Sequence, residues 1–160
     1  HDPAFDDAYQ FSGWANAALV GRDSLAVVFP LSDTLYLYGT DGRELQKFRL
    51  SLDNYRRLRE PGPQDGTPEA EIRWRNSYTR ISQVLRGPGR SVYVQYFNLD
   101  GLEPVWGLAR FSLDGGQLRK QFEVPQAHRL LGVSPRDFRH YFLRADLMES
   151  TVWSIGRSYR

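Results

Sequence analysis

The residues best suited to binding chemistry are arginine and aromatic side chains that lie close together in the sequence: Arg73, Trp74, Arg75, Tyr78 and Arg80. A guanidinium can stack on a sugar, a base or a peptide side chain, and it can hold a carboxylate through two hydrogen bonds. We therefore predict that these residues bind a ligand. The alternative is a strand edge on which the arginine side chains cover a buried tryptophan.

The three histidines, His1, His128 and His140, do not form a metal-binding pattern. None has a second histidine or a carboxylate at the spacing of a zinc motif. Cysteine is absent, which excludes disulfides and thiolate-bound metals. We predict no metal and no cofactor. His128 is expected in a loop, and His140 on one face of a strand, as a packed residue in preference to a catalytic base.

Local sequence patterns offer no catalytic nucleophile. The chain contains no G-x-S-x-G, Walker or G-x-G-x-x-G motif. Asp-Gly pairs at positions 41, 100 and 114 lack the spaced oxygen ligands of a calcium loop, so hairpin turns explain them. We assign no catalytic residue and favour binding over catalysis. The alternative is a hydrolase or lyase whose site is assembled from distant strands and includes His140.

The composition favours a packed β protein. The 160 residues are 41% hydrophobic and 14% aromatic, with nine Tyr, nine Phe and four Trp, and aromatic side chains fit the pleated surface of a sheet. The formal net charge is +2, and acidic residues are interspersed with the basic ones, unlike the concentrated basic face of a nucleic-acid-binding protein. The longest apolar run, Leu25–Leu31, is too short for a membrane helix. We expect no nucleic-acid partner and no membrane span.

One segment occurs twice in the chain. Residues 41–50 (DGRELQKFRL) recur as residues 114–124 (DGGQLRKQFEV), with one residue inserted before the second Phe. Each copy follows an alternating apolar stretch, so the repeated unit is a β-hairpin with an Asp-Gly turn. The copies are offset by 73 positions, from Leu45 to Leu118, which fits one four-stranded unit of about 40–50 residues plus an insertion. This spacing predicts β-propeller blades.

The repeat divides the chain into three units. Four-stranded blades are predicted over residues 17–50 and 78–124, and an incomplete blade of three strands over residues 129–157. Residues 51–76, rich in Pro and Gly in their middle, are predicted to form a long loop. A long loop on a rigid scaffold is typical of a binding surface, so we place the ligand site at a rim that includes residues 54–80.

These segments carry a family resemblance. Residues 78–96, 106–114 and 132–142 resemble the C-terminal half of secreted six-bladed β-propeller proteins of unknown function. The resemblance covers roughly residues 17–157, although the basic and aromatic YYR ending common in that group is not reproduced after Tyr96. Many of those proteins are exported bacterial lipoproteins. The resemblance therefore implies a periplasmic or extracellular location and a lipid-anchored parent protein.

The expected fold is all-β, with about three four-stranded antiparallel blades. Such a chain is either part of a longer propeller or one of two copies that pair into a six-bladed ring. A β-sandwich or a barrel is the alternative fold. The expected function is a non-catalytic binding or scaffold module whose ligand is a protein or a glycan.

Overall fold

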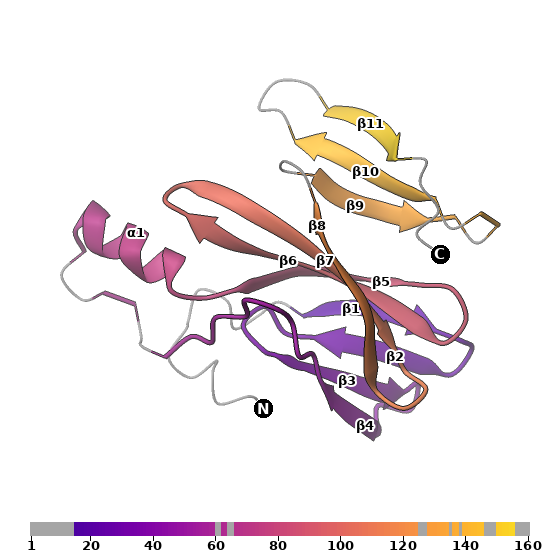
Figure 1. Cartoon of the computed structure of the whole chain (residues 1–160). Coiled ribbons are helices and arrows are strands. Elements are labelled where there is room, and N and C mark those ends of the chain that lie inside the picture. Colours follow the sequence, from indigo (N-terminus) through magenta and orange to yellow (C-terminus); the bar gives the residue numbers. More distant parts are fainter. Residues whose placement is uncertain are drawn as a thin grey trace.

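The computed structural model describes residues 15–59, 62–63, 66–124, 128–134, 136–137, 139–145 and 150–155. These residues form three antiparallel sheets and a single helix (Figure 1). Most of the described residues lie in strands, which confirms the all-β prediction. Residues 156–157, at the end of the third predicted unit, lie outside the described residues.

The first sheet is an antiparallel meander in which each strand pairs with the next one along the chain. Its strands are β1 (Asn16–Val20), β2 (Ser24–Val28), β3 (Thr34–Gly39) and β4 (Glu44–Arg49). Burial alternates along β3, where Leu35 and Leu37 are buried and Tyr36 and Tyr38 are partly exposed. One face of this sheet therefore contributes to a core.

The second sheet has the same up-and-down order and is covered on both faces. Its strands are β5 (Arg80–Arg86), β6 (Ser91–Asp100), β7 (Glu103–Ser112) and β8 (Gln117–Val124). Every residue of β6 from Ser91 to Tyr96 is buried. Val92 and Val94 belong to the core shared with the first sheet, whereas Tyr93 belongs to a second core cluster.

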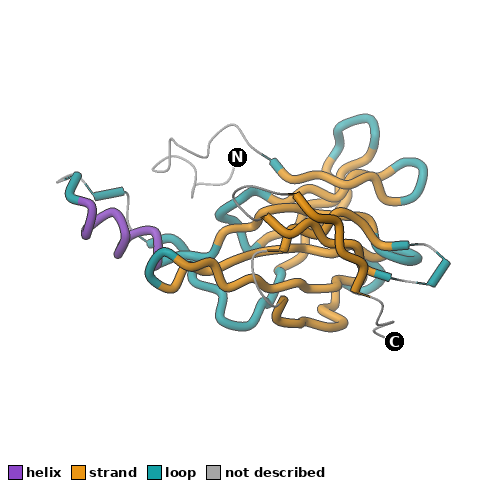
Figure 2. Tube along the Cα trace, turned by 90° about the horizontal axis from the view of Figure 1, so that it is seen from above, coloured by secondary structure: helices purple, strands orange, loops and turns teal. Residues whose placement is uncertain are grey.

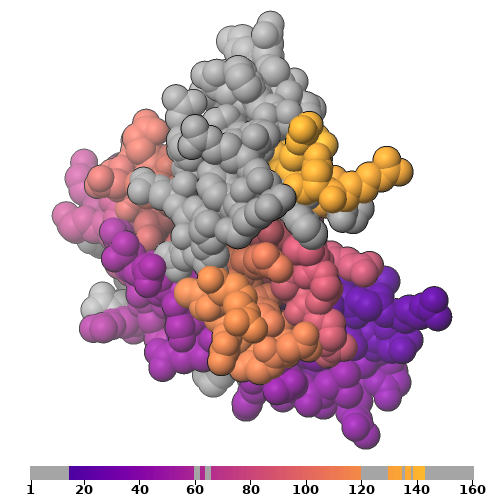
Figure 3. Space-filling view, turned by 45° about the vertical axis from the view of Figure 1, so that its right-hand side comes forward, coloured from indigo at the N-terminus to yellow at the C-terminus, as the bar shows by residue number. Residues whose placement is uncertain are grey.

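A third sheet completes the described structure. Its strands are β9 (His128–Val133), β10 (His140–Ala145) and β11 (Ser150–Ile155), again paired in chain order. Leu130 and Phe142 pack against Tyr93 and Leu108 of the second sheet. The three sheets form successive layers, with the second sheet in the middle (Figure 1), and Figure 3 shows this sheet between the described surfaces of its two neighbours.

The Asp-Gly turns form as predicted. Gly42 and Gly115 adopt φ angles of +80° and +82°, a region that glycine enters without steric cost. They lie in the hairpins β3–β4 and β7–β8, so both copies of the repeated segment occupy the same position in their sheets. The strand register also shifts in each hairpin, between Leu37 and Tyr38 in the first and between Arg110 and Phe111 in the second.

The prediction that residues 51–76 form only a loop is wrong at their C-terminal end. Helix α1 spans Pro68–Asn76, and the Thr67 hydroxyl caps it by accepting a hydrogen bond from the Ala70 N–H at 3.3 Å. Pro68 is one of the prolines that favour a loop in this segment. At the first position of a helix, however, proline needs no N–H partner and has a suitable φ angle. The helix projects from one end of the sheets (Figure 2).

The described sheets do not close into a ring. The first strands of the sheets are nevertheless neighbours, since β1 contacts β5 and β5 contacts β9. No helix among the described residues is long and apolar enough to cross a membrane.

Candidate functional site

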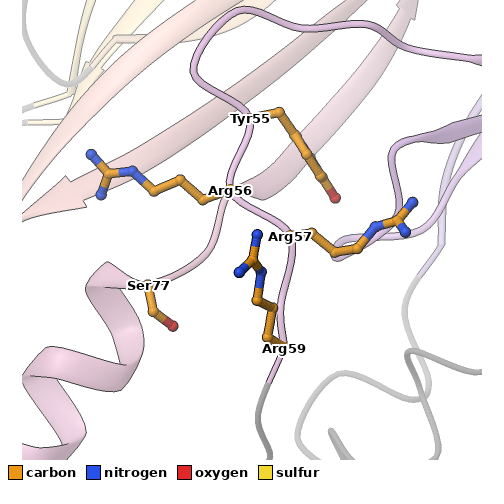
Figure 4. Close-up of a pocket in the computed structure, with 5 residues that line it drawn as sticks. All are labelled: Tyr55, Arg56, Arg57, Arg59 and Ser77. Atoms are coloured by element: carbon orange, nitrogen blue, oxygen red, sulfur yellow. The ribbon is translucent and has the colours of Figure 1, made fainter.

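Three arginines line a pocket beside the end of α1. This arginine pocket has a volume of about 430 Å³, and its lining consists of Tyr55, Arg56, Arg57, Arg59 and Ser77. Figure 4 shows the Arg59 side chain between those of Arg56 and Arg57, whose guanidinium groups point to opposite sides. Positive charge is therefore spread along the segment and is not concentrated at one point.

Buried hydrogen bonds fix the backbone of the pocket. The Arg56 N–H donates to the Thr79 hydroxyl at 2.8 Å, and the Thr79 N–H donates to the Arg56 carbonyl at 2.8 Å. The Thr79 hydroxyl in turn donates to Asn98 Oδ1 at 2.6 Å. Thr79 and Asn98 are both buried, so water competes little for these bonds. The segment that carries the arginines is thus attached to β6.

The Arg56 guanidinium is held by backbone carbonyls. Its Nη1 donates to the Asn76 carbonyl at 2.7 Å and to the Leu99 carbonyl at 3.3 Å. Asn76 ends α1, where unpaired carbonyls attract a cation, and Leu99 lies on β6. These contacts orient the side chain without neutralising its charge.

Arg57 differs from its neighbours because a carboxylate neutralises it. Its Nη2 lies 3.1 Å and 3.0 Å from the two oxygens of Asp33. Arg49 also pairs with Asp33, with its Nε 3.3 Å from Oδ2. Arg59 has no ion pair within the part of the chain that the structure describes. One carboxylate is therefore shared between two arginines, while Arg56 and Arg59 keep their full charge.

A second pocket adjoins the first and shares Tyr55 and Arg56 with it. Its volume is about 460 Å³, and its lining consists of Asn54, Tyr55, Arg56, Asn98, Leu99, Asp100 and Val105. Two aliphatic side chains are exposed at this hairpin of β6 and β7: Leu102 is 74% exposed and Val105 is 43% exposed. The two pockets together offer cationic and apolar contacts.

Of the five residues predicted from the sequence to bind a ligand, the structure brings Trp74, Tyr78 and Arg80 together and leaves Arg73 and Arg75 on the exposed side of α1. Arg73 and Arg75 are exposed on α1, and Arg75 forms an ion pair with Glu71 one turn earlier. The Trp74 ring packs edge-on against Tyr78, 5.1 Å between centroids, and Tyr78 is 0% exposed. Tyr78 is therefore part of the packing beneath the helix.

The Arg80 guanidinium lies over two aromatic rings. Its guanidinium carbon lies 4.4 Å from the centroid of Tyr78 and 5.5 Å from that of Phe97, and its Nη2 donates to the Tyr78 hydroxyl at 2.7 Å. None of the five nominated residues lines either pocket. The arginines at positions 56, 57 and 59 lie within the rim predicted over residues 54–80, and their spacing in the sequence was the signal that could have identified them.

His140 is buried between the second and third sheets, on the packed face predicted for it. It is 1% exposed, its ring lies edge-on to Tyr93 at 4.9 Å, and it stacks on Phe142 at 6.3 Å. Burial lowers the pKa of His140 below its usual 6.5, and the Arg110 charge lowers this pKa further. Burial also raises the pKa of Tyr93, an effect that Arg110 partly opposes. The imidazole is therefore neutral at pH 7.

The stability of the protein should consequently fall when the pH drops below about 6.5. Protonation is harder in the folded state than in the unfolded state, so the unfolded chain binds the proton first and is favoured by acid. We expect the urea midpoint to decrease between pH 7 and pH 5 more steeply in the wild type than in His140→Phe. Equal slopes in the two proteins would show that His140 does not carry this dependence.

The described residues contain no group of three or more His, Cys, Asp or Glu side chains that could hold a metal ion. In comparisons with known proteins, no family model, no curated protein and no solved structure matches the chain.

Proposed function

We propose that this chain is a non-catalytic binding module of the β-propeller type, which binds a macromolecular ligand, a protein or a glycan, at the arginine pocket. The observation that carries the proposal is the attachment of an arginine-bearing segment to β6 through Thr79 and Asn98. Binding surfaces that are ordered before the ligand arrives lose less entropy on binding. A guanidinium that no carboxylate neutralises provides the attraction.

The arrangement of the first strands supports the propeller part of the proposal. Asn16 on β1 donates from its side-chain amide to the Ile81 carbonyl on β5 at 3.2 Å. Gln95 Oε1 on β6 accepts the Leu130 N–H of β9 at 2.9 Å. Blades of a propeller place their first strands around a common axis and stack their faces on one another. In the first two sheets β1 contacts β5, and in the second and third sheets β5 contacts β9.

The outer face of the first sheet carries apolar side chains, as expected if a further layer covers it. Leu19, Leu25 and Tyr38 are paired across β1, β2 and β3 and therefore share a face. Leu19 is 52% exposed. An apolar sheet face of this kind suits coverage by another sheet, as a longer propeller or a second copy would provide.

Catalysis is less well supported than binding. The hydrolase or lyase alternative requires His140 to reach a substrate, and its side chain is packed between Tyr93 and Phe142. A packing role accounts for all of these contacts.

The test is binding to defined arrays of peptides and glycans. The wild type is compared with Arg59→Gln and with Arg43→Gln, a matched control at the exposed β3–β4 turn. A lost hydrogen bond to a charged group costs about 1.5–3 kcal/mol, so ligands of the pocket should bind Arg59→Gln about 10–100-fold more weakly. Arg43→Gln should bind like the wild type. The proposal fails if no array member binds, or if every ligand binds all three proteins equally.

A further inference from the structure

The positive charge around the arginine pocket is only partly neutralised within the described residues. Asp33 is shared between Arg49 and Arg57, whereas Arg56 and Arg59 have no carboxylate partner among the described residues. Two exposed guanidinium groups thus flank one pocket with their charges unneutralised. A ligand that supplies carboxylates to this segment would be attracted to it and held by hydrogen bonds.

The distribution of the arginines favours several carboxylates on one extended ligand. Figure 4 shows Arg56 and Arg57 pointing to opposite sides with Arg59 between them. A single small anion can contact only part of this set. Arg56 uses its Nη1 for the Asn76 and Leu99 carbonyls, which leaves the Nε and Nη2 edge, a pair of parallel donors that matches a carboxylate.

The second pocket indicates which groups of the ligand would lie next to its carboxylates. Asp100 lines this pocket and would repel a carboxylate there, so the ligand's acidic groups belong on the arginine side. Val105 also lines it, and Leu102 is exposed on the same hairpin. Exposed aliphatic side chains beside a polar rim are typical of surfaces that bind apolar side chains.

A peptide fits this combination better than a glycan or a nucleic acid. Sugars and bases are commonly held against the open face of an aromatic ring. Among the described residues that line either pocket, Tyr55 is the only aromatic one. It is half-buried, and its hydroxyl donates to the Leu31 carbonyl at 2.7 Å. Aliphatic contacts combined with guanidinium groups match acidic and aliphatic side chains on one polypeptide.

We propose that the ligand is an acidic peptide segment whose carboxylates bind at Arg56 and Arg59 and whose neighbouring aliphatic side chain contacts Leu102 and Val105. This inference rests on the proposed function, because it names the ligand of the same site. It makes the affinity depend on salt, since the contacts of Arg56 and Arg59 are exposed.

The experiment measures dissociation constants by fluorescence anisotropy for three labelled peptides of equal length and for one oligouronate. The first peptide alternates Glu with Leu, the second replaces Glu by Gln, and the third replaces Leu by Ser. The proteins are the wild type, Arg59→Gln, Arg56→Lys, Leu102→Ser and the control Arg43→Gln. Arg56→Lys keeps the charge but removes the paired donors. Arg59→Gln changes an exposed side chain that forms no hydrogen bond or ion pair among the described residues, so we expect it to fold like the wild type.

The Glu-Leu peptide should bind the wild type and Arg43→Gln equally. The Gln peptide should bind the wild type at least about tenfold more weakly than the Glu-Leu peptide does. Arg59→Gln should bind the Glu-Leu peptide more weakly than the wild type by a similar factor. Arg56→Lys should bind the Glu-Leu peptide severalfold more weakly than the wild type. Leu102→Ser and the Ser peptide should each lose a few-fold in affinity.

Failure of this inference can be distinguished from failure of the proposed function. If the Gln peptide or the oligouronate binds at least as tightly as the Glu-Leu peptide and still depends on Arg59, the acidic peptide is wrong and the binding site stands. If the Glu-Leu peptide does not bind, the inference is overturned. If, in addition, no array ligand depends on Arg59, both proposals are overturned.

Discussion

Phe111→Ala is expected to lower the free energy of unfolding by about 3–5 kcal/mol. Phe111 is 1% exposed on β7, and its ring lies 5.6 Å from that of Phe48 on β4. It therefore fills the core between the first and second sheets, and its removal leaves a cavity that the surrounding strands cannot fully close. Urea unfolding followed by tryptophan fluorescence measures the loss.

Phe111→Leu is the matched control for this prediction. Leucine restores much of the volume, so we expect a markedly smaller loss than for alanine. A loss below about 1 kcal/mol for Phe111→Ala would mean that Phe111 does not hold these two sheets together.

Gln95→Leu is expected to lower the free energy of unfolding by about 2–4 kcal/mol, although the new side chain is similar in size. Gln95 is 0% exposed, and its Oε1 accepts hydrogen bonds from Gln83 Nε2 at 2.8 Å and from the Leu130 N–H at 2.9 Å. Gln83 Nε2 also donates to the Leu130 carbonyl. Leucine removes the acceptor and leaves two buried donors with fewer bonds.

Hydrogen exchange gives this second prediction a local readout. The Leu130 amide should exchange faster in Gln95→Leu than in the wild type, because its acceptor is gone. Gln46→Leu, an exposed substitution on β4, is the control and should change neither stability nor exchange at Leu130. Unchanged protection of Leu130 in Gln95→Leu would contradict the proposed attachment of the third sheet.

The strands were the most predictable part of the fold because their signals are local. Alternation at Leu35–Tyr38 and the Asp-Gly turns at Gly42 and Gly115 are visible within a few residues. The face of His140 followed from the same alternation. Helix α1 was missed because Pro68 is compatible with both a break and a helix start, and only the Thr67 cap distinguishes them.

The sequence indicated the region that contains the arginine pocket but not the residues that line it. The rim over residues 54–80 includes the arginine pocket, whereas the nominated Tyr78 became part of the packing under α1. The orientation of Arg56 depends on Thr79 and on the Leu99 carbonyl, which are distant in sequence. Sequence patterns do not encode which backbone carbonyls a side chain will meet after the sheets have packed.

The pairing of every strand with its neighbour along the chain has a consequence for how the protein folds. Within each sheet, the hydrogen-bond ladders connect segments that are separated only by short turns or by one loop, so little chain entropy is lost in closing them. Contacts of high sequence separation arise mainly where one sheet packs on the next, as between Phe48 and Phe111. The slow step of folding should therefore be the docking of one sheet on the next. We expect substitutions on the packed faces of the sheets to change the folding rate more than substitutions in the turns.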